Sequence, residues 1–418
     1  MRDHRLPTSP GFWRSPLRGP WFTSVLGVVL LVGITVLFVT GLLSYAAYNP
    51  ELSPVNDKTP DKGLLGFYLF AWPTDPPWLY RLTQGVHVTL GIVLIPVLLA
   101  KLWSVLPKLF TLPPVRSLAH ALERISLLLL VGGALFVFVT GVLNVQLDYL
   151  FPGSFYPLHF YGAWVFFAAF VTHAVLRVPA ALRNLRHLRA ESSEEGSGEG
   201  SELVSPAPAP PTVSRRGALG LVGGGSLLLL VTTAGRSFDG PLRETALLAP
   251  HGGPEPDSGP GGFQINKTAA SRGVGAAETS DAAWRLVVEG NGRTVRLSRA
   301  ELARLPLHSA ALPIACVEGW STSDQSWRGV RLRDLAALVG YEPGTAPDVL
   351  VESLQRHGSF RRAALRDNQV RDPRALLALF VNGSPLTPDH GYPARIIVPA
   401  APGVLNTKWV ARMTFGDL

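Results

Sequence analysis

The sequence predicts a protein of two parts, an N-terminal all-α region of membrane-spanning helices and a C-terminal α+β domain. Four apolar stretches, at about 22–46, 84–106, 124–147 and 157–178, each approach the ~20 residues that a helix needs to cross a bilayer. The chain is 47% hydrophobic and only 16% charged, which is unusual for a soluble protein. From residue 284 onward, short strand-like and helix-like segments alternate, as in α+β folds.

Basic residues indicate how these helices are oriented. They cluster before the first stretch, between the second and third, and after the fourth, whereas the loops 47–83 and 148–156 contain few. The positive-inside rule therefore places the N-terminus and the basic loops in the cytoplasm. We expect Trp72, Trp78 and Tyr80 at the outer membrane interface. The net charge of +8 reflects this topology, and we expect no nucleic-acid partner.

Changes in composition divide the chain into a four-helix membrane domain, a Glu/Ser/Gly/Pro linker, a fifth apolar segment, a Gly/Pro-rich connector and the C-terminal domain. Their predicted bounds are 1–189, 190–213, 214–236, 237–283 and 284–418. The linker has too few apolar residues to bury a core, so we expect it to be disordered.

The fifth apolar segment has two interpretations. It is glycine-rich and begins with Arg215 and Arg216. It is either a fifth transmembrane helix or a twin-arginine signal anchor, because such export signals begin with a pair of arginines. Both interpretations place the C-terminal domain outside the cytoplasm, in a multi-pass protein of the cell membrane.

The C-terminal domain begins with a predicted β-hairpin, since residues 284–288 and 294–297 alternate apolar and polar around Gly290-Asn291-Gly292. Ser298 and Glu301 form a capping box at the start of a short helix. A second helix is predicted at 332–339, and further strands at 349–354, 376–381 and 396–398. No internal repeat is evident.

Three histidines, His87, His159 and His173, lie inside predicted spanning helices, where an ionisable group is costly and calls for a function or a strong partner. His87 and His159 lie near the outer ends of their helices, and two facing imidazoles can ligate a haem iron axially. His173 follows His159 by 14 residues, which is about 21 Å along a helix, on the same face. His173 is placed to ligate a second haem or to line a quinone pocket. The simpler alternative for all three histidines is that each only hydrogen-bonds a neighbouring helix.

The segments Gln84-Gly-Val-His87, Leu158-His159-Phe160-Tyr161-Gly162 and Thr172-His173 resemble the four-helix cytochrome b subunits of formate dehydrogenases and nickel–iron hydrogenases. The resemblance implies haem b and electron exchange with membrane quinone. In those subunits the first helix supplies a ligand to the inner haem, but the stretch 22–46 contains no histidine. His120 is an alternative ligand there.

Cys316 is the only cysteine in 418 residues, which excludes an internal disulfide and a multi-cysteine metal site. By default a lone cysteine behind an apolar run is a small buried hydrophobic residue. Here a polar turn containing Gly319 follows at once, so the thiolate is placed to ligate a soft metal.

The run Cys316-Val-Glu-Gly-Trp320 resembles the molybdenum-ligand loop of the sulfite-oxidase-fold molybdopterin oxidoreductases, especially the bacterial branch with the catalytic subunit of methionine sulfoxide reductase. Further similar motifs follow, from Trp327 to Arg331, from Asp389 to Arg395 and from Gly403 to Lys408. The resemblance implies that Cys316 ligates molybdenum, and that cofactor-binding residues are Asn266, His390, Gly391, Arg395, Gly403 and Lys408. Alternatively His390 only completes a turn. The sulfite oxidases of this family carry an arginine shortly after the ligand cysteine to hold the oxyanion, whereas residues 317–321 include no cation, so the comparison makes sulfite a less expected substrate.

These observations predict a membrane-bound molybdopterin-dependent oxidoreductase. Oxygen-atom transfer would occur at an extracytoplasmic molybdenum centre, with electrons relayed through haem b to or from the quinone pool. The expected substrate is a small oxo compound such as a sulfoxide or N-oxide; a further electron-transfer partner is an open expectation. The rival hypothesis is a non-catalytic membrane haem protein with an empty molybdopterin-fold module.

Overall fold

A computed structural model of the chain describes residues 7–8, 12–52, 55, 70–110, 117–145, 155–190, 205, 208–238, 241–248 and 259–418. The chain divides into two compact units. Unit 1 comprises residues 1–39, 89–143 and 158–231, and unit 2 comprises 40–88, 144–157 and 232–418. Most of the predicted linker 190–213, and parts of the loops 47–83 and 148–156 and of the connector 237–283, lie outside the described residues.

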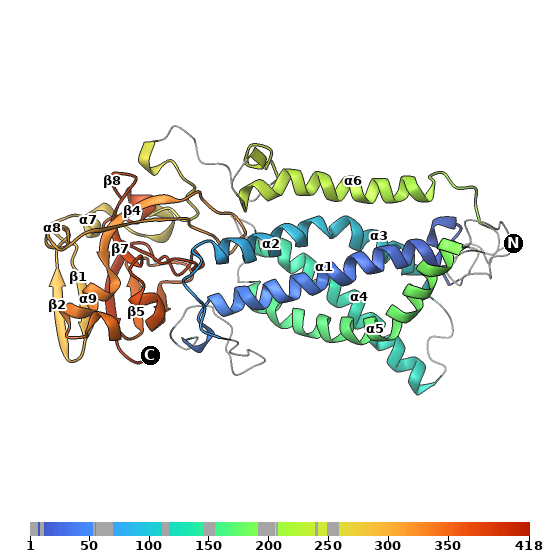
Figure 1. Cartoon of the computed structure of the whole chain (residues 1–418), viewed down its shortest axis with the longest axis horizontal. Helices are drawn as coiled ribbons and strands as arrows, with labels where there is room; N and C mark the ends of the chain where they lie inside the picture. Colours follow the sequence, from blue (N-terminus) through green and yellow to red (C-terminus); the bar gives the residue numbers. More distant parts are fainter. Residues whose placement is uncertain are drawn as a thin grey trace. The chain divides into compact units, whose positions relative to one another are not determined.

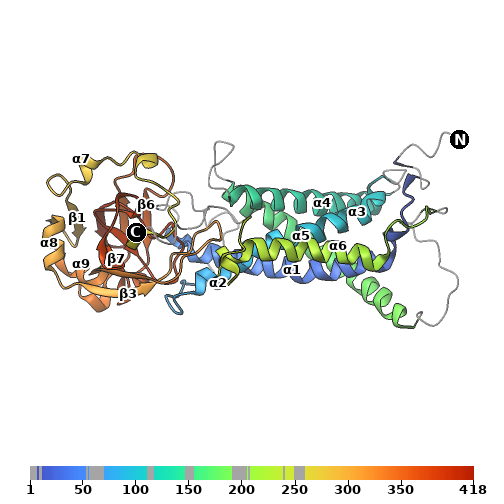
Figure 2. The same ribbon diagram turned by 90° about the horizontal axis from the view of Figure 1, so that it is seen from above.

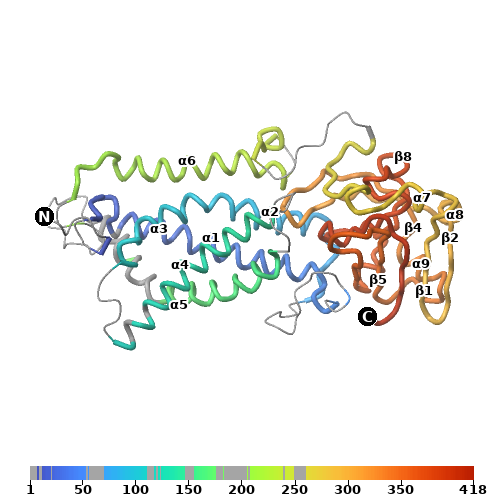
Figure 3. The backbone as a smooth tube through the Cα atoms, turned by 180° about the vertical axis from the view of Figure 1, so that it is seen from behind, coloured from blue at the N-terminus to red at the C-terminus, as the bar shows by residue number. Residues whose placement is uncertain are grey.

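Unit 1 is built from helices that lie side by side (Figures 1, 2 and 3). Apolar side chains of α1, α3, α4 and α5 meet in one core, which includes Leu30, Leu98, Val137 and Phe166, and α6 packs partly against it. The helices are α1 (Pro20–Ala47), α2 (Leu79–Val93), α3 (Ile95–Leu109), α4 (Leu118–Asn144), α5 (Tyr156–Ala190) and α6 (Arg215–Thr233). Four of them are long and apolar enough to cross a membrane, as is the pair α2 and α3 if it counts as one span.

The second predicted span, 84–106, is broken in the structure. Helix α2 ends at Val93, α3 begins at Ile95, and the two are bent by 42°. Pro96 stands in the first turn of α3. Proline lacks the backbone N–H that a continuous helix would use there, and its ring collides with the carbonyl four residues earlier, so the helix restarts at this point.

The C-terminal part of unit 2 contains two five-stranded sheets. The first has the order β2-β1-β10-β5-β6, with β1 parallel to β10 and the other pairs antiparallel. The second has the order β3-β4-β7-β8, with β9 also paired to β7. The strands are β1 (Leu286–Gly290), β2 (Arg293–Leu297), β3 (His308–Leu312), β4 (Gln325–Arg331), β5 (Val349–Ser353), β6 (Arg362–Leu365), β7 (Leu376–Val381), β8 (Ser384–Pro385), β9 (Arg395–Ile397) and β10 (Val410–Phe415).

Short helices complete this α+β domain (Figure 1): α7 (Ala276–Thr279), α8 (Arg299–Arg304), α9 (Leu332–Leu338) and α10 (Asp367–Arg371). The predicted hairpin is confirmed as β1–β2. The predicted capping box is confirmed too, since Ser298 Oγ accepts from the Glu301 amide at 3.2 Å and Glu301 Oε2 accepts from the Ser298 amide at 2.7 Å. Strands β3, β4, β6 and β10 were not predicted, because they alternate less regularly or are interrupted by charged residues.

Aromatic side chains of the loop 47–83 are buried in unit 2. Trp72 is buried, and its indole N–H donates to the Ala400 carbonyl at 2.7 Å. Asn49 Nδ2 donates to the Ala364 carbonyl at 3.1 Å, and Tyr80 is buried in the same unit, whereas Trp78 is 51% exposed. Trp72 and Tyr80 are therefore packed inside unit 2, where the C-terminal domain contributes to their surroundings, and their place at a membrane interface stays a prediction. The described part of this loop is an integral part of unit 2.

Candidate functional site

Cys316 stands at the start of a tight loop that follows β3. The Cys316 amide donates to the Trp320 carbonyl at 2.8 Å, and the Gly319 amide donates to the Cys316 carbonyl at 3.1 Å. Gly319 has a φ of +90°, in the left-handed region that favours glycine. Ala315 forms bridges to both Ser321 and Pro402, so the base of the loop is fixed. The loop therefore presents the cysteine side chain from a rigid frame.

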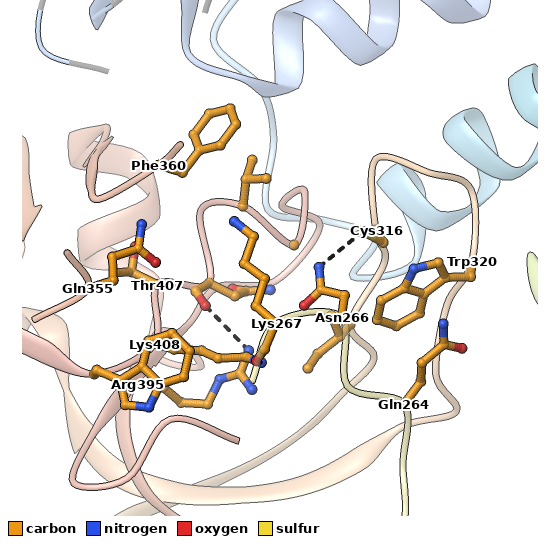
Figure 4. A pocket seen from close by; sticks show the side chains of 15 residues that line it. Gln264, Asn266, Lys267, Cys316, Trp320, Gln355, Phe360, Arg395, Thr407 and Lys408 are labelled. Carbon is orange, nitrogen blue, oxygen red and sulfur yellow. Dashed lines mark hydrogen bonds between the residues drawn. The ribbon is translucent and has the colours of Figure 1, made fainter. Parts of the chain in front are cut away.

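The thiol of Cys316 has two polar neighbours. Asn266 Nδ2 is 3.7 Å from Cys316 Sγ, as Figure 4 shows, and Glu318 Oε2 is 3.1 Å from the same sulfur. Trp320 Nε1 donates to Glu318 Oε2 at 3.0 Å, which fixes the carboxylate. Burial, with the nearby Glu318 charge, raises the pKa of the thiol well above its usual value. A bound cation would reverse this effect, because metals bind the thiolate.

Three cations line the same pocket, Lys267, Arg395 and Lys408 (Figure 4). Arg395 is buried, and burial lowers its pKa to about 9. The two lysines are half-buried as whole residues, but burial of their ammonium groups lowers both pKa values, with the neighbouring cations adding to the effect. Within the described residues none of the three has a carboxylate oxygen within 4.0 Å.

Backbone carbonyls orient these cations. Lys408 Nζ donates to the carbonyls of Lys267 and Asp389 at 2.9 and 2.8 Å. Arg395 donates from Nη1 to the His390 carbonyl at 3.0 Å and from Nη2 to the Asn406 carbonyl at 3.3 Å. Clustered buried cations without counter-charge are costly, so this arrangement favours an anionic ligand.

The pocket also contains buried polar atoms that lack a hydrogen-bond partner among the described residues. They are both amide atoms of Gln264, Nε of Arg395 and Oγ1 of Thr407. Such atoms are rare in folded proteins and call for a ligand or water. Donors, acceptors and cations beside one thiol fit a phosphate-bearing pterin whose metal is held by sulfur.

The structure brings together most of the residues predicted for this site. Cys316, Asn266, Arg395, Gly403 and Lys408 all line the pocket. The Gly403 amide donates to the Ala315 carbonyl at 2.7 Å, which places Gly403 against the cysteine loop.

His390 and Gly391 lie behind the pocket rather than in it. His390 Nδ1 is 2.8 Å from Thr387 Oγ1, and Nε2 is 3.1 Å from the Phe263 carbonyl. Burial lowers the pKa of His390 to about 4, with the charges of Arg395 and Lys408 adding to the effect. Gly391, with a φ of +108°, supports the cations, since a Cβ there would lie 3.1 Å from the Cβ atoms of both Arg395 and Lys408.

Lys267, Gln264 and Glu318 belong to the site but were not among the predicted site residues. Lys267 and Gln264 flank the predicted Asn266, and the density of polar residues in this segment was the available signal. Glu318 is only two residues from Cys316, but this spacing alone does not show that its carboxylate turns back to the sulfur.

In the helices, the histidines have matching surroundings. Thr40 Oγ1 is 3.1 Å from His87 Nδ1, and Thr140 Oγ1 is 3.1 Å from His159 Nδ1. A Cβ on Gly41 would lie 3.1 Å from the His87 ring, and one on Gly141 would lie 3.3 Å from the His159 ring. His173 lies in α5 and is half-buried. The side chain of His120 lies outside the described residues.

These surroundings come from a short internal repeat that the sequence analysis missed. The sequence Phe-Val-Thr-Gly occurs at 38–41 in α1 and at 138–141 in α4. Four residues are too few to detect a repeat in apolar helices, and only the structure shows that both copies contact a histidine.

Comparisons with known proteins concern the C-terminal part. Residues 274–417 match the family model of the oxidoreductase molybdopterin binding domain. The mitochondrial sulfite oxidase of Rattus norvegicus is 32% identical over 156 residues, which cover 31% of this chain and 29% of that protein. The uncharacterized oxidoreductase YuiH of Bacillus subtilis is 32% identical over 133 residues, which cover 32% of this chain and 65% of that protein.

Among solved structures, the sulfane dehydrogenase SoxCD of Paracoccus pantotrophus is 25% identical, with a TM-score of 0.30, over 33% of this chain and 39% of that one. The chain spans less than a third of the length of the mitochondrial sulfite oxidases that it matches.

Proposed function

We propose that this chain is a membrane-bound enzyme that transfers an oxygen atom outside the cytoplasm and exchanges electrons with quinone through haem b. Its residues 274–417 match a molybdopterin-binding oxidoreductase domain of the sulfite oxidase type. The observation that supports it best is the pocket itself. One pocket is lined by a buried thiol, by three cations without a carboxylate partner among the described residues, and by several polar atoms that those residues leave without a hydrogen bond. The site calls for a ligand of the molybdopterin class.

Each pocket residue has a defined role in this proposal. The Cys316 thiolate would hold the metal, and Asn266 would donate toward the sulfur from 3.7 Å. Lys408, Arg395 and Lys267 would bind the phosphate, while the Gln264 amide would pair with donors and acceptors of the pterin. A bound molybdopterin supplies the two-electron oxygen-atom chemistry. The protein excludes water and fixes the geometry.

The absence of a cation at positions 317–321 favours a neutral substrate, such as a sulfoxide or N-oxide, over sulfite. Glu318 points in the same direction, because its carboxylate lies 3.1 Å from Cys316 Sγ, where an anionic substrate would be repelled.

His87 and His159 are the proposed axial ligands of haem b. The hydroxyl of Thr140 donates to the Phe136 carbonyl at 2.7 Å, so its oxygen is left to accept from His159 Nδ1–H. In that tautomer the lone pair is on Nε2, the atom that would bind iron. Thr40 Oγ1 lies at the same distance, 3.1 Å, from His87 Nδ1, which supports the same role for His87. His173 is the proposed ligand of a second haem.

The proposal includes the location of the protein in the cell membrane. The spans, the positive-inside pattern and the outer loop that packs within unit 2 support a multi-pass protein with its C-terminal domain outside. Arg215 and Arg216, exposed at the start of α6, suit a twin-arginine signal anchor.

The proposal is tested on the full chain purified in detergent from cells that make molybdopterin. Mass spectrometry would give the molybdenum content and the pyridine haemochrome would give the haem. We expect near-stoichiometric molybdenum, haem b, and oxidation of the haem when a sulfoxide is added to the quinol-reduced protein. Haem without molybdenum would overturn the enzyme and favour the non-catalytic haem protein.

A further inference from the structure

The loop that carries Cys316 contacts the helix that carries His87. Gln84 Nε2 donates a hydrogen bond to the Val317 carbonyl. Gln84 is buried and lies three residues before His87 in α2, one helical turn away, while Val317 is the residue bonded to Cys316. All four residues belong to unit 2.

A second contact joins the same two segments. A Cβ built on Gly319 would lie 2.6 Å from the Cβ of Val88, the residue after His87. Only glycine permits this approach, and its φ of +90° also favours glycine. The backbone of the cysteine loop at Gly319 therefore packs directly against the side chain of Val88 in α2.

We propose that Gln84 is the positioning residue for electron transfer between the two proposed centres, haem and molybdenum. The route runs from His87 along one turn of α2 to Gln84, across one hydrogen bond to Val317, and through one peptide bond to Cys316. It consists of covalent bonds and a single hydrogen bond, with no gap through space. This inference rests on the proposed function, since it requires both centres.

In the reductive direction the electrons would move from quinol to the substrate. Quinol would supply the electrons, which a haem held by His87 would pass one at a time to a molybdenum centre held by Cys316. Two such transfers match the two electrons that a sulfoxide accepts as it loses oxygen to form the sulfide, with two protons completing water. In the oxidative direction each transfer is reversed.

The test compares Gln84→Leu, which keeps the approximate volume but removes the donor, with Thr83→Val as a matched control. Thr83 is buried on the same helix, and its hydroxyl donates to the carbonyls of Leu79 and Tyr80 in its own helix. Haem in the loaded protein is reduced by a flash of light with a flavin photosensitiser. Its reoxidation is followed optically, and the electron that arrives is followed as Mo(V) by electron paramagnetic resonance.

We expect the transfer rate constant in Gln84→Leu to fall tenfold to roughly a hundredfold, the scale that a displacement of about 1 Å has on a positioned reaction. In Gln84→Leu the reduction potentials and the contents of haem and molybdenum should match those of the wild type. The electron-transfer rate constant of Thr83→Val should equal that of the wild type. An unchanged rate in Gln84→Leu, or an equal loss in Thr83→Val, would overturn the inference. Missing haem or molybdenum in the wild type would overturn the proposed function instead.

A second readout does not need the cofactor. In protein made without molybdenum, hydrogen exchange of the peptide 312–322 should speed up in Gln84→Leu and stay unchanged in Thr83→Val. Unchanged exchange in both would show that Gln84 does not hold the loop. If Gln84→Leu loses a cofactor, Gln84→Asn, which keeps the amide but shortens it by one methylene, gives the same kinetic comparison.

Discussion

The cofactor pocket and the surroundings of His87 and His159 differ in how they provide partners for buried polar groups. Both bury groups that are costly in an apolar environment. In the pocket, three cations have no carboxylate within 4.0 Å and several polar atoms have no hydrogen-bond partner among the described residues, and the segments around Gln264, Cys316 and Arg395 are far apart in sequence. At the histidines, a threonine supplies a partner and a glycine supplies space, within a repeated four-residue motif. The pocket thus depends on its ligand for stability, whereas the histidines are oriented before a ligand binds.

The largest expected effect is the loss of one cofactor without loss of the other. Cys316→Ala should abolish oxygen-atom transfer and lower the molybdenum content but leave the haem spectrum intact, because the chain has no other cysteine to bind the metal. His87→Ala should remove haem and leave molybdenum in place. Metal and pigment analysis of both variants checks this, and loss of both groups in either variant would contradict the assignment.

Acid should destabilise the pocket through His390. Its pKa is about 4 in the folded protein and about 6.5 when unfolded, so the unfolded state binds more protons between these values. The contribution of His390 to the free energy of unfolding is therefore fully present above pH 6.5. It is lost as the pH is lowered toward 4, by up to about 3 kcal/mol. Urea unfolding of the full chain, followed by tryptophan fluorescence, measures this loss. His390→Asn should flatten this pH dependence, and the control His308→Gln, at a half-buried histidine outside the pocket, should not. A steep slope in His390→Asn would assign the loss to other groups.

Lys408→Met tests whether the pocket is built for an anion. The change removes a buried ammonium group while retaining most of its volume. We expect the cofactor-free protein to become more stable by about 1–3 kcal/mol, while molybdopterin content falls. Arg412→Met is the control, because Arg412 pairs with Glu289 at 3.0 Å on the surface. A less stable cofactor-free Lys408→Met would mean that Lys408 supports the fold rather than the ligand.

The smallest effect concerns the pre-oriented histidines. Thr40→Val and Thr140→Val keep the shape of the side chain but remove the partner of Nδ1. Loss of such a partner typically lowers metal affinity by about 10- to 100-fold. Haem titration of the cofactor-free variants should show similar losses for both, and no change for Thr35→Val, whose hydroxyl donates to the Leu31 carbonyl of its own helix. A loss at only one position would show that the two copies of the motif are not equivalent.

The parts of this account that the sequence could predict are those that depend on neighbours in the chain. Helix length, the hairpin at β1–β2 and the Ser298 cap follow from local patterns. Cys316 was located because a lone thiol precedes a glycine turn. By contrast, Gln84 and Val317 are 233 residues apart, and no local pattern indicates that they pair.

Two features that the sequence did not predict have physical causes of the same kind. The stretch 84–106 was expected to be one span, whereas Pro96, which lacks a backbone N–H, stands where α3 begins after α2 has ended. Trp72 is of a residue type common at membrane interfaces, and residue type alone did not indicate that its indole N–H donates to the Ala400 carbonyl. In both cases a backbone group is involved, which hydropathy alone does not indicate.

X-ray absorption at the molybdenum edge tests the central claim most directly, because it reports the atoms bound to the metal. We predict that the purified wild-type protein contains molybdenum with a protein thiolate among its sulfur ligands. In Cys316→Ser the remaining molybdenum, held through the pocket cations, should have one sulfur fewer. An unchanged sulfur shell in Cys316→Ser would contradict the account, because the metal would then not be bound by the only cysteine in the chain.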